Sequence, residues 1–255
     1  MNQSKLKELL DLKYEQYNKF EFIASDPISI PHLFSKKEDI EIAAFLSATI
    51  AWGQRVSILK NAKRLMEYMD MSPYDFIINA NTYDLDNFKK FAHRTFNGDD
   101  CVFFLKSIRT IYKKYGSMET VFNSGYNKDN TIKSAIIELR NTFFNLSHLT
   151  RVEKHFSDPE KNSASKRINL FLRWMIRNDK NRVDFGIWKN IPSSALLCPL
   201  DVHSANVSRK LGLLTRKQND WKAVEELTSN LRKFDPNDPA KYDFALFGLG
   251  IFEKF

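Results

Sequence analysis

Residues 40–52, IEIAAFLSATIAW, are apolar almost all the way round a helical projection. A helix of this kind is normally buried on every side, at the centre of a helical domain. Ser35 and Glu38 form the pattern S-x-x-E just before it, which predicts a capping box, and Gly53 suits the helix end. The stretch therefore predicts a buried central helix and an all-α fold.

Helical periodicity continues on both sides of this central segment. Apolar residues recur at spacings of three and four in the segments 58–69, 100–115, 164–177, 202–212 and 220–232. A last helix is expected after Asp238. Only eight glycines and eight prolines occur in 255 residues. Many short strands and tight turns are therefore not expected.

The segment 164–177 is the most regular of these helices. Its apolar stripe is predicted to pack in the core and consists of Ile168, Phe171, Leu172, Met175 and Ile176. Lys166, Arg173 and Arg177 lie on the opposite side of the helical projection. We expect this side to be a basic face in contact with solvent.

The positive charge of the chain is concentrated in one region. The formal net charge is +8, and residues 150–217 contain 14 Lys and Arg but only 6 Asp and Glu. Such a region suits a phosphate-rich partner, because neutralising phosphates releases counterions. A merely solubilising basic face explains the same numbers equally well.

The remaining composition restricts location and cofactors. Two distant cysteines, Cys101 and Cys198, fit neither a disulfide framework nor an iron–sulfur or cysteine-based metal motif. The charged N-terminus does not have the apolar core of a signal peptide, and no run is long enough to span a bilayer. We expect a cytoplasmic protein that uses no cofactor or metal and does not associate with a membrane.

The strongest candidate for chemistry lies in residues 196–214, LLCPLDVHSANVSRKLGLL. Asp201 follows a proline-ended apolar run and precedes a helix, so N-capping is its most frequent role. A capping carboxylate can nevertheless stabilise a cation that develops beside it. His203 two residues later suggests a metal ligand, but no further cluster accompanies it. Packing or hydrogen bonding near the helix start is the expected role of His203.

Two other places carry candidate residues. Lys166 at the start of the 164–177 helix is either part of a solvated basic face or a nucleophile, in which case Arg167 would help to lower its pKa. Trp52, Gln54 and Arg55 lie at the junction between two apolar helices. They form an ordinary interhelical turn, or they fill the gap that an extruded base leaves in DNA.

Together these segments resemble the helix-hairpin-helix DNA glycosylase superfamily, which includes endonuclease III. LDVHSANVSRKLGLL resembles the segment in which a catalytic Asp is followed by x-His and by a helix that carries Arg. SASKRINL resembles the start of the second hairpin helix, and AAFLSATIAWGQRVSILKNAKRL resembles the first helical pair. The 35-residue separation of Lys166 and Asp201 is closer to the archaeal 8-oxoguanine glycosylase branch. The chain also resembles a bacterial family of unknown function related to this superfamily.

The resemblance implies roles for individual residues. Lys166 takes the position of the lysine that forms a Schiff base, and Asp201 takes that of the catalytic Asp. Either Thr49 or Gln54 fills the gap left by the extruded base, and we choose Gln54. The family hairpin binds a DNA phosphate through two glycines, and residues 158–166 contain none. Phosphate contacts are then expected from side chains such as Lys161. The further expected DNA contacts are Trp52, Arg55, Arg167, His203 and Arg209.

The resemblance also implies a bilobed helical fold and an activity. One lobe comprises residues 35–180, with a hairpin-type helix pair near 150–177, and the second comprises 1–34 plus 181–255. A monomer would flip a damaged base of double-stranded DNA into a cleft between the lobes and cleave its glycosidic bond, with an abasic-site lyase step at Lys166. Two alternatives remain open, a non-catalytic DNA- or RNA-binding protein on the same scaffold and a helical interaction protein.

Overall fold

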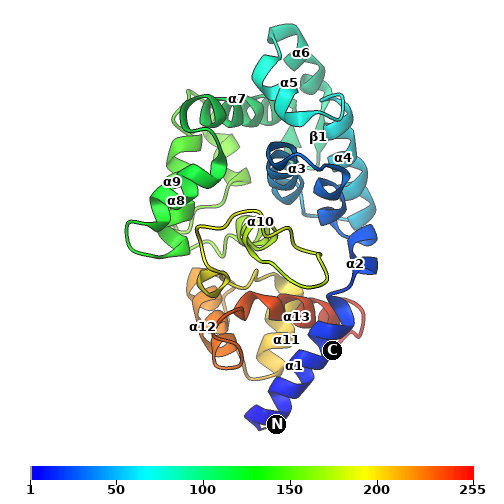
Figure 1. Cartoon of the computed structure of the whole chain (residues 1–255), viewed down its shortest axis with the longest axis vertical. Helices are drawn as coiled ribbons and strands as arrows, with labels where there is room; N and C mark the ends of the chain where they lie inside the picture. Colours follow the sequence, from blue (N-terminus) through cyan, green and yellow to red (C-terminus); the bar gives the residue numbers. More distant parts are fainter. Residues whose placement is uncertain (1) are drawn as a thin grey trace. The chain divides into compact units, whose positions relative to one another are not determined.

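The computed structural model of the chain describes residues 2–255 and is all-α, which confirms the fold class predicted from the sequence (Figure 1). The strands of these residues are two residues long, Ala92–His93 (β1) and Phe96–Asn97 (β2), and pair antiparallel. Within residues 2–255, no helix has the length and apolar character needed to span a membrane.

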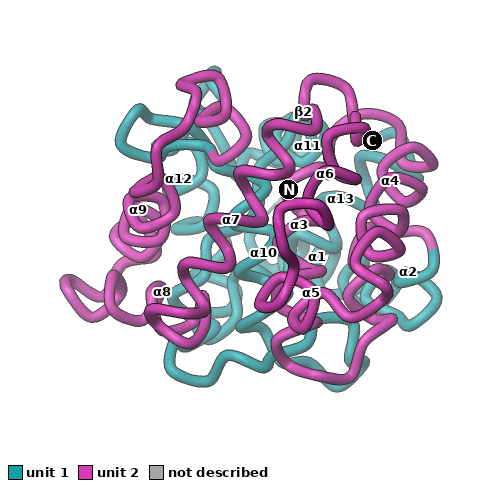
Figure 2. Tube along the Cα trace, turned by 90° about the horizontal axis from the view of Figure 1, so that it is seen from above, with its two compact units in different colours: residues 1–24, 157–255 teal, residues 25–156 magenta. Residues whose placement is uncertain are grey.

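The contacts within the chain define two compact units (Figure 2). We call Ser25–Phe156 the central unit. The chain up to Ala24 and Ser157–Phe255 together form the terminal unit.

The central unit is built from short and medium helices. Its α-helices are α3 (Lys37–Thr49), α4 (Arg55–Glu67), α5 (Pro73–Asn79), α6 (Thr82–Asp86), α7 (Gly98–Tyr115), α8 (Met118–Tyr126) and α9 (Ile132–Phe143). Its 3-10 helices are Pro27–Ser29, Pro31–Leu33, Asn87–Lys90 and Thr150–His155.

Helix α3 is the buried central helix that the sequence predicts. All residues from Ile40 to Thr49 are buried, including Glu41, which accepts hydrogen bonds from the Tyr112 hydroxyl and from the Met118 amide. The predicted capping box is wrong, because Lys36 rather than Ser35 is the N-cap and makes no side-chain cap bond. The apolar pattern thus predicts the burial of the helix but not its first turn.

The terminal unit contains both ends of the described chain. Its α-helices are α1 (Gln3–Tyr17), α2 (Phe20–Ser25, whose last residue belongs to the central unit), α10 (Lys166–Ile176), α11 (Val202–Lys210), α12 (Trp221–Arg232) and α13 (Tyr242–Ile251). Its 3-10 helices are Ser193–Ala195 and Pro239–Lys241. Helices α1 and α13, from opposite ends of the sequence, pack side by side.

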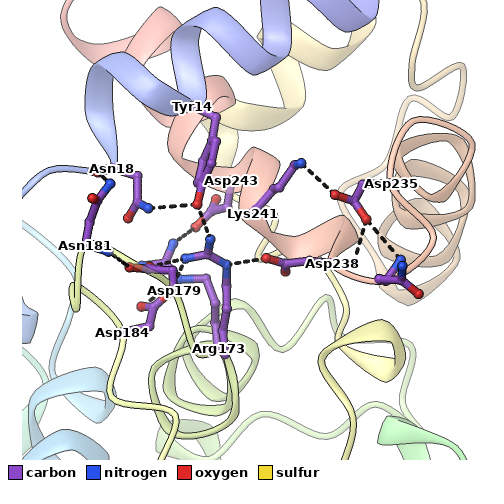
Figure 3. A network of polar contacts seen from close by, with 12 residues as sticks. Tyr14, Asn18, Arg173, Asp179, Asn181, Asp184, Asp235, Asp238, Lys241 and Asp243 are labelled. Carbon is purple, nitrogen blue, oxygen red and sulfur yellow. Dashed lines mark hydrogen bonds and ion pairs between the residues drawn. The ribbon is translucent and has the colours of Figure 1, made fainter.

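Helix α10 buries its predicted apolar stripe, but its basic side is not solvated as expected. Arg173 and Arg177 are both almost completely buried. Arg177 donates to Asp238 at 2.8 Å, to Asp184 at 2.9 Å and to the Tyr14 hydroxyl at 2.7 Å. Figure 3 shows Arg173 in this network, with carboxylates from several segments of the chain around it. The expectation of a solvated face is therefore wrong for these two positions.

The two units have other boundaries than the lobes suggested by the sequence. The sequence suggested lobes of 35–180 and of 1–34 plus 181–255, whereas the units separate after residues 24 and 156. Residues 157–165 and α10 therefore belong to the terminal unit, whereas the 3-10 helix Thr150–His155 belongs to the central unit. The ion pairs of Arg173 and Arg177 with Asp184, Asp238 and Asp243 tie α10 to this unit.

Candidate active site

Lys166 and Asp201, 35 residues apart in the sequence, lie together in the terminal unit. The distance from Lys166 Nζ to Asp201 Oδ2 is 3.8 Å. Lys166 is the first residue of α10, and Asp201 is the N-cap of α11. Their side chains are 28% and 27% exposed, so both groups are partly accessible to solvent. An amine and a carboxylate thus meet at the surface of one unit, where two helices begin.

The two oxygens of Asp201 have different surroundings. Oδ1 accepts a hydrogen bond from the Ser204 amide at 2.9 Å, and the Asp201 amide donates to Ser204 Oγ at 2.9 Å. This reciprocal pair is a capping box, which fixes the carboxylate with respect to the helix axis. Oδ2 is the oxygen that faces Lys166. The cap therefore positions the second oxygen for contact with the lysine.

The segment before α10 forms a turn that contains no glycine. Asn162 and Ser165 have φ values of 61° and 46°, in the left-handed region that glycine normally occupies. Asn162 Nδ2 donates to Asp220 Oδ2 at 2.9 Å, and the Trp221 amide donates to the Asn162 carbonyl at 3.1 Å. These bonds fasten the turn to the start of α12 and so fix where α10 begins.

A third carboxylate of the site was not recognised in the sequence. Asp243 lies in the first turn of α13 and accepts a hydrogen bond from Arg173 Nη1. Burial raises the pKa of Asp243 to about 6, although the charges of Arg173 and Lys166 act to lower it, and the charge of Asp201 raises it further. Asp243 is thus electrostatically coupled to both members of the pair. The signal in the sequence was a lone acid in the otherwise apolar segment 242–251, YDFALFGLGI.

The other expected DNA contacts of the terminal unit have different surroundings. Lys161 and His203 are exposed. Arg167 is half-buried, and burial lowers its pKa to about 10. Arg209 donates to the carbonyls of Arg216 and Lys217 at 2.9 and 2.8 Å, and to Asn219 Oδ1 at 2.6 Å. The guanidinium of Arg209 therefore organises the loop that precedes α12.

The expected base-contacting corner, Trp52, Gln54 and Arg55, belongs to the central unit. The Trp52 ring stacks on His155 with centroids 5.8 Å apart, and its carbonyl accepts a hydrogen bond from His93 at 3.0 Å. These contacts give Trp52 a packing role in the turn. Gln54 is the exposed N-cap of α4, and Arg55 lies 3.7 Å from Asp26.

The exposed Arg94, in the turn between β1 and β2, was not expected at this corner. Its side chain packs against Gly53, where an added Cβ would lie 2.9 Å from Arg94 Cδ. Gly53 also has a φ of 103°, so its backbone conformation favours glycine. The corner thus presents an exposed amide, Gln54, and an exposed arginine.

Residues 2–255 contain neither a cluster of metal-ligating side chains nor a disulfide. Within residues 2–255, no group of three His, Cys, Asp or Glu side chains is placed to hold a metal ion. Cys101 and Cys198 are both buried and unpaired with each other.

Comparison with known proteins places the chain in a family. A family model described as "Protein of unknown function (DUF2400)" matches residues 26–252, so the chain belongs to this family. The search of curated proteins and that of solved structures found no match. The candidate site at Lys166 and Asp201 lies within the matched residues.

Proposed function

We propose that the protein is a DNA glycosylase that also cleaves abasic sites, with Lys166 and Asp201 as its catalytic residues. The observation that carries this proposal is the 3.8 Å separation of an accessible amine and an accessible carboxylate at the starts of α10 and α11. The likeness of the two segments to the glycosylase motifs supports it independently.

Asp201 is assigned the electrostatic role. The glycosidic bond of a nucleotide breaks with positive charge developing on the sugar, and an ionised carboxylate held beside that charge lowers the barrier. The capping box fixes Asp201 through Oδ1, so no reorganisation is needed when the charge develops. Asp201 Oδ2 faces the reacting sugar in this assignment.

Lys166 is assigned the nucleophilic role. Its neutral amine uses the nitrogen lone pair to form a bond to C1′ of the sugar, while the bond to the base breaks and the base leaves with the electron pair and takes up a proton. Opening of the sugar ring then gives an imine between Lys166 and the former C1′. Loss of a C2′ proton from this imine expels the 3′ phosphate and breaks the strand.

Exposed polar groups supply contacts to the nucleic acid. Lys161 and His203 of the terminal unit, and Gln54 and Arg94 of the central unit, are exposed. Contacts from Lys161 and Arg94 to phosphates are sequence-independent and weaken steeply as salt rises. Arg209 is left out of this set, because the loop before α12 occupies its guanidinium.

Base release and strand cleavage test the proposal. Duplex oligonucleotides that carry 8-oxoguanine, an oxidised pyrimidine, uracil or an abasic site are incubated with the parent protein. The double variant Lys166→Gln/Asp201→Asn is compared with Lys222→Gln, which removes an exposed lysine of α12. We expect the parent and Lys222→Gln to act on at least one substrate and the double variant to act on none.

Other outcomes assign the protein to the alternatives. Salt-dependent DNA or RNA binding without base release or cleavage on any substrate indicates a non-catalytic nucleic-acid-binding protein. Absence of nucleic-acid binding at low salt indicates a helical interaction protein. Either result refutes the proposed activity.

A further inference from the structure

A cavity of about 410 Å³ lies in the terminal unit, where α1 begins and where α11 and α12 end. Small-molecule sites in proteins are typically cavities of about 300 to 1,000 Å³. Lys166 and Asp201 do not line this cavity. It is therefore a feature of the terminal unit separate from the candidate active site.

The charged side chains that line the cavity are both cationic. Within residues 2–255, Lys210 and Lys233 line it, and no Asp or Glu does. Both lysines are exposed, and neither forms an ion pair with another of these residues. Asp235, the acid nearest to Lys233 in the sequence, is paired with Lys241, at 2.6 Å from Oδ2 to Nζ. The cavity thus presents two ammonium groups that no carboxylate neutralises.

The two ammonium groups are not occupied in capping the helices that end there. Lysines near a helix C-terminus often bond to its last carbonyls. At the end of α11, however, the Leu213 amide donates to the Ser208 carbonyl at 2.8 Å. At the end of α12, the Phe234 amide donates to the Leu231 carbonyl at 3.0 Å. Backbone amides therefore satisfy these helix ends without the lysines.

Asn230 of α12 holds the ammonium group of Lys233 at the cavity. Lys233 Nζ donates to Asn230 Oδ1 at 2.7 Å, and Asn230 Nδ2 donates to the Leu213 carbonyl at 2.8 Å. The carboxamide is thus fixed by hydrogen bonds at both of its ends. An ammonium group has three N–H donors, so the bond to Asn230 leaves two for a ligand.

The other walls of the cavity are largely apolar. Leu6 of α1 and Leu213 are buried, and Phe234 is half-buried. The Phe234 ring packs edge-on against Tyr242, with the ring centroids 6.3 Å apart, and this contact supports the ring from α13. The cavity therefore combines two exposed cations with an apolar and aromatic wall.

We propose that this cavity binds a phosphate monoester that carries an apolar or aromatic group. A phosphate monoester has a charge of about −1.5 to −2 at pH 7, which matches two ammonium groups. Its oxygens accept hydrogen bonds from Lys210 and Lys233, and its organic group lies against Leu6 and Phe234. Binding of this ligand is non-covalent and uses no group of the proposed glycosylase reaction.

Titration calorimetry of the whole protein with three probes tests the inference. The probes are phenyl phosphate, inorganic phosphate and benzyl alcohol, which supply the charge and the ring together, the charge alone and the ring alone. We expect phenyl phosphate to bind more tightly than the other two, and its affinity to fall as salt rises, because salt screens exposed charges. Absence of phenyl phosphate binding, or an affinity no higher than that of either other probe, overturns the inference.

Variants of the lining residues show whether the probe lies in this cavity. Lys210→Gln and Lys233→Gln should each weaken phenyl phosphate binding by roughly 10- to 100-fold, the usual loss for one hydrogen bond between charged groups. Phe234→Leu should weaken the binding of phenyl phosphate and leave that of inorganic phosphate unchanged. Lys222→Gln is the matched control, because Lys222 is an exposed lysine of the same helix outside the cavity.

The lysine variants decide the matter if Phe234→Leu does not fold. Parent affinity in both Lys210→Gln and Lys233→Gln, or an equal loss in Lys222→Gln, overturns the inference. The titrations contain no nucleic acid and leave Lys166 and Asp201 unchanged, so such a result leaves the proposed glycosylase activity standing.

Discussion

Substitutions of Asp201 separate its capping role from its proposed catalytic role. Asn can accept the Ser204 amide bond as Asp201 Oδ1 does, so Asp201→Asn keeps the cap but removes the negative charge. The ion pair with Lys166 spans 3.8 Å between side chains that are both about a quarter exposed. A pair of this kind contributes about 0–1 kcal/mol, so the free energy of unfolding of Asp201→Asn should fall by less than that.

Asp201→Asn and Asp201→Ala should therefore differ in stability but not in activity. Asp201→Ala loses the cap as well, which costs about 1 kcal/mol more. Both variants should lose base-release activity by about 100- to 1,000-fold, the usual effect of removing one preorganised electrostatic group. Thr131→Ala is the matched control for the loss of a cap, because Thr131 caps α9 of the central unit through the Ser134 amide.

Urea unfolding and single-turnover base release measure the two effects separately. We expect Thr131→Ala to keep the parent activity. If Asp201→Asn is as active as the parent, or if the activity of both Asp201 variants merely follows their stability, the carboxylate only caps α11 and the reasoning is refuted.

Three further predictions concern stability and reactivity. Arg177→Met leaves several carboxylates without their common partner, so it should lower the free energy of unfolding, measured in urea, by about 3–5 kcal/mol. Arg182→Met, at an exposed position, should change it by less than about 0.5 kcal/mol. Equal losses in the two variants would contradict the network. Gly248→Ala places a methyl group against a tyrosine ring of α1, so it should lower the free energy of unfolding by about 1–3 kcal/mol in the same measurement. An unchanged free energy of unfolding would show that α1 does not pack there. Burial raises the pKa of both the Cys101 and the Cys198 thiol, so iodoacetamide should modify them in denaturant but not in the native protein, and fast native labelling detected by mass spectrometry would contradict their burial.

The apolar patterns predicted the core because they report which side of a helix is hydrophobic. The stripes of α3 and α10 are buried as their spacing indicates. The same reasoning failed for Arg173 and Arg177, because a helical projection does not show what packs against the polar side. Their carboxylate partners Asp238 and Asp243 lie 61 and 70 residues away, on segments that only the fold brings near.

The local features of the site were also only partly visible in the sequence. Asp201 before a helix predicted an N-cap, and the structure has that cap. The absence of glycine from 158–166 gave no indication that Asn162 and Ser165 would adopt left-handed conformations, which asparagine tolerates and serine seldom does. Asp243 was missed because a single acid in an apolar helix does not identify its neighbours.

Borohydride trapping on an abasic-site duplex tests the central claim most directly. Hydride reduces the imine to a stable secondary amine, so an attacking lysine remains bonded to the DNA and can be located by digestion and mass spectrometry. We predict an adduct on Lys166, its loss in Lys166→Gln and its retention in Lys222→Gln. An adduct on another residue, or the same adduct yield in Lys166→Gln, would contradict the account.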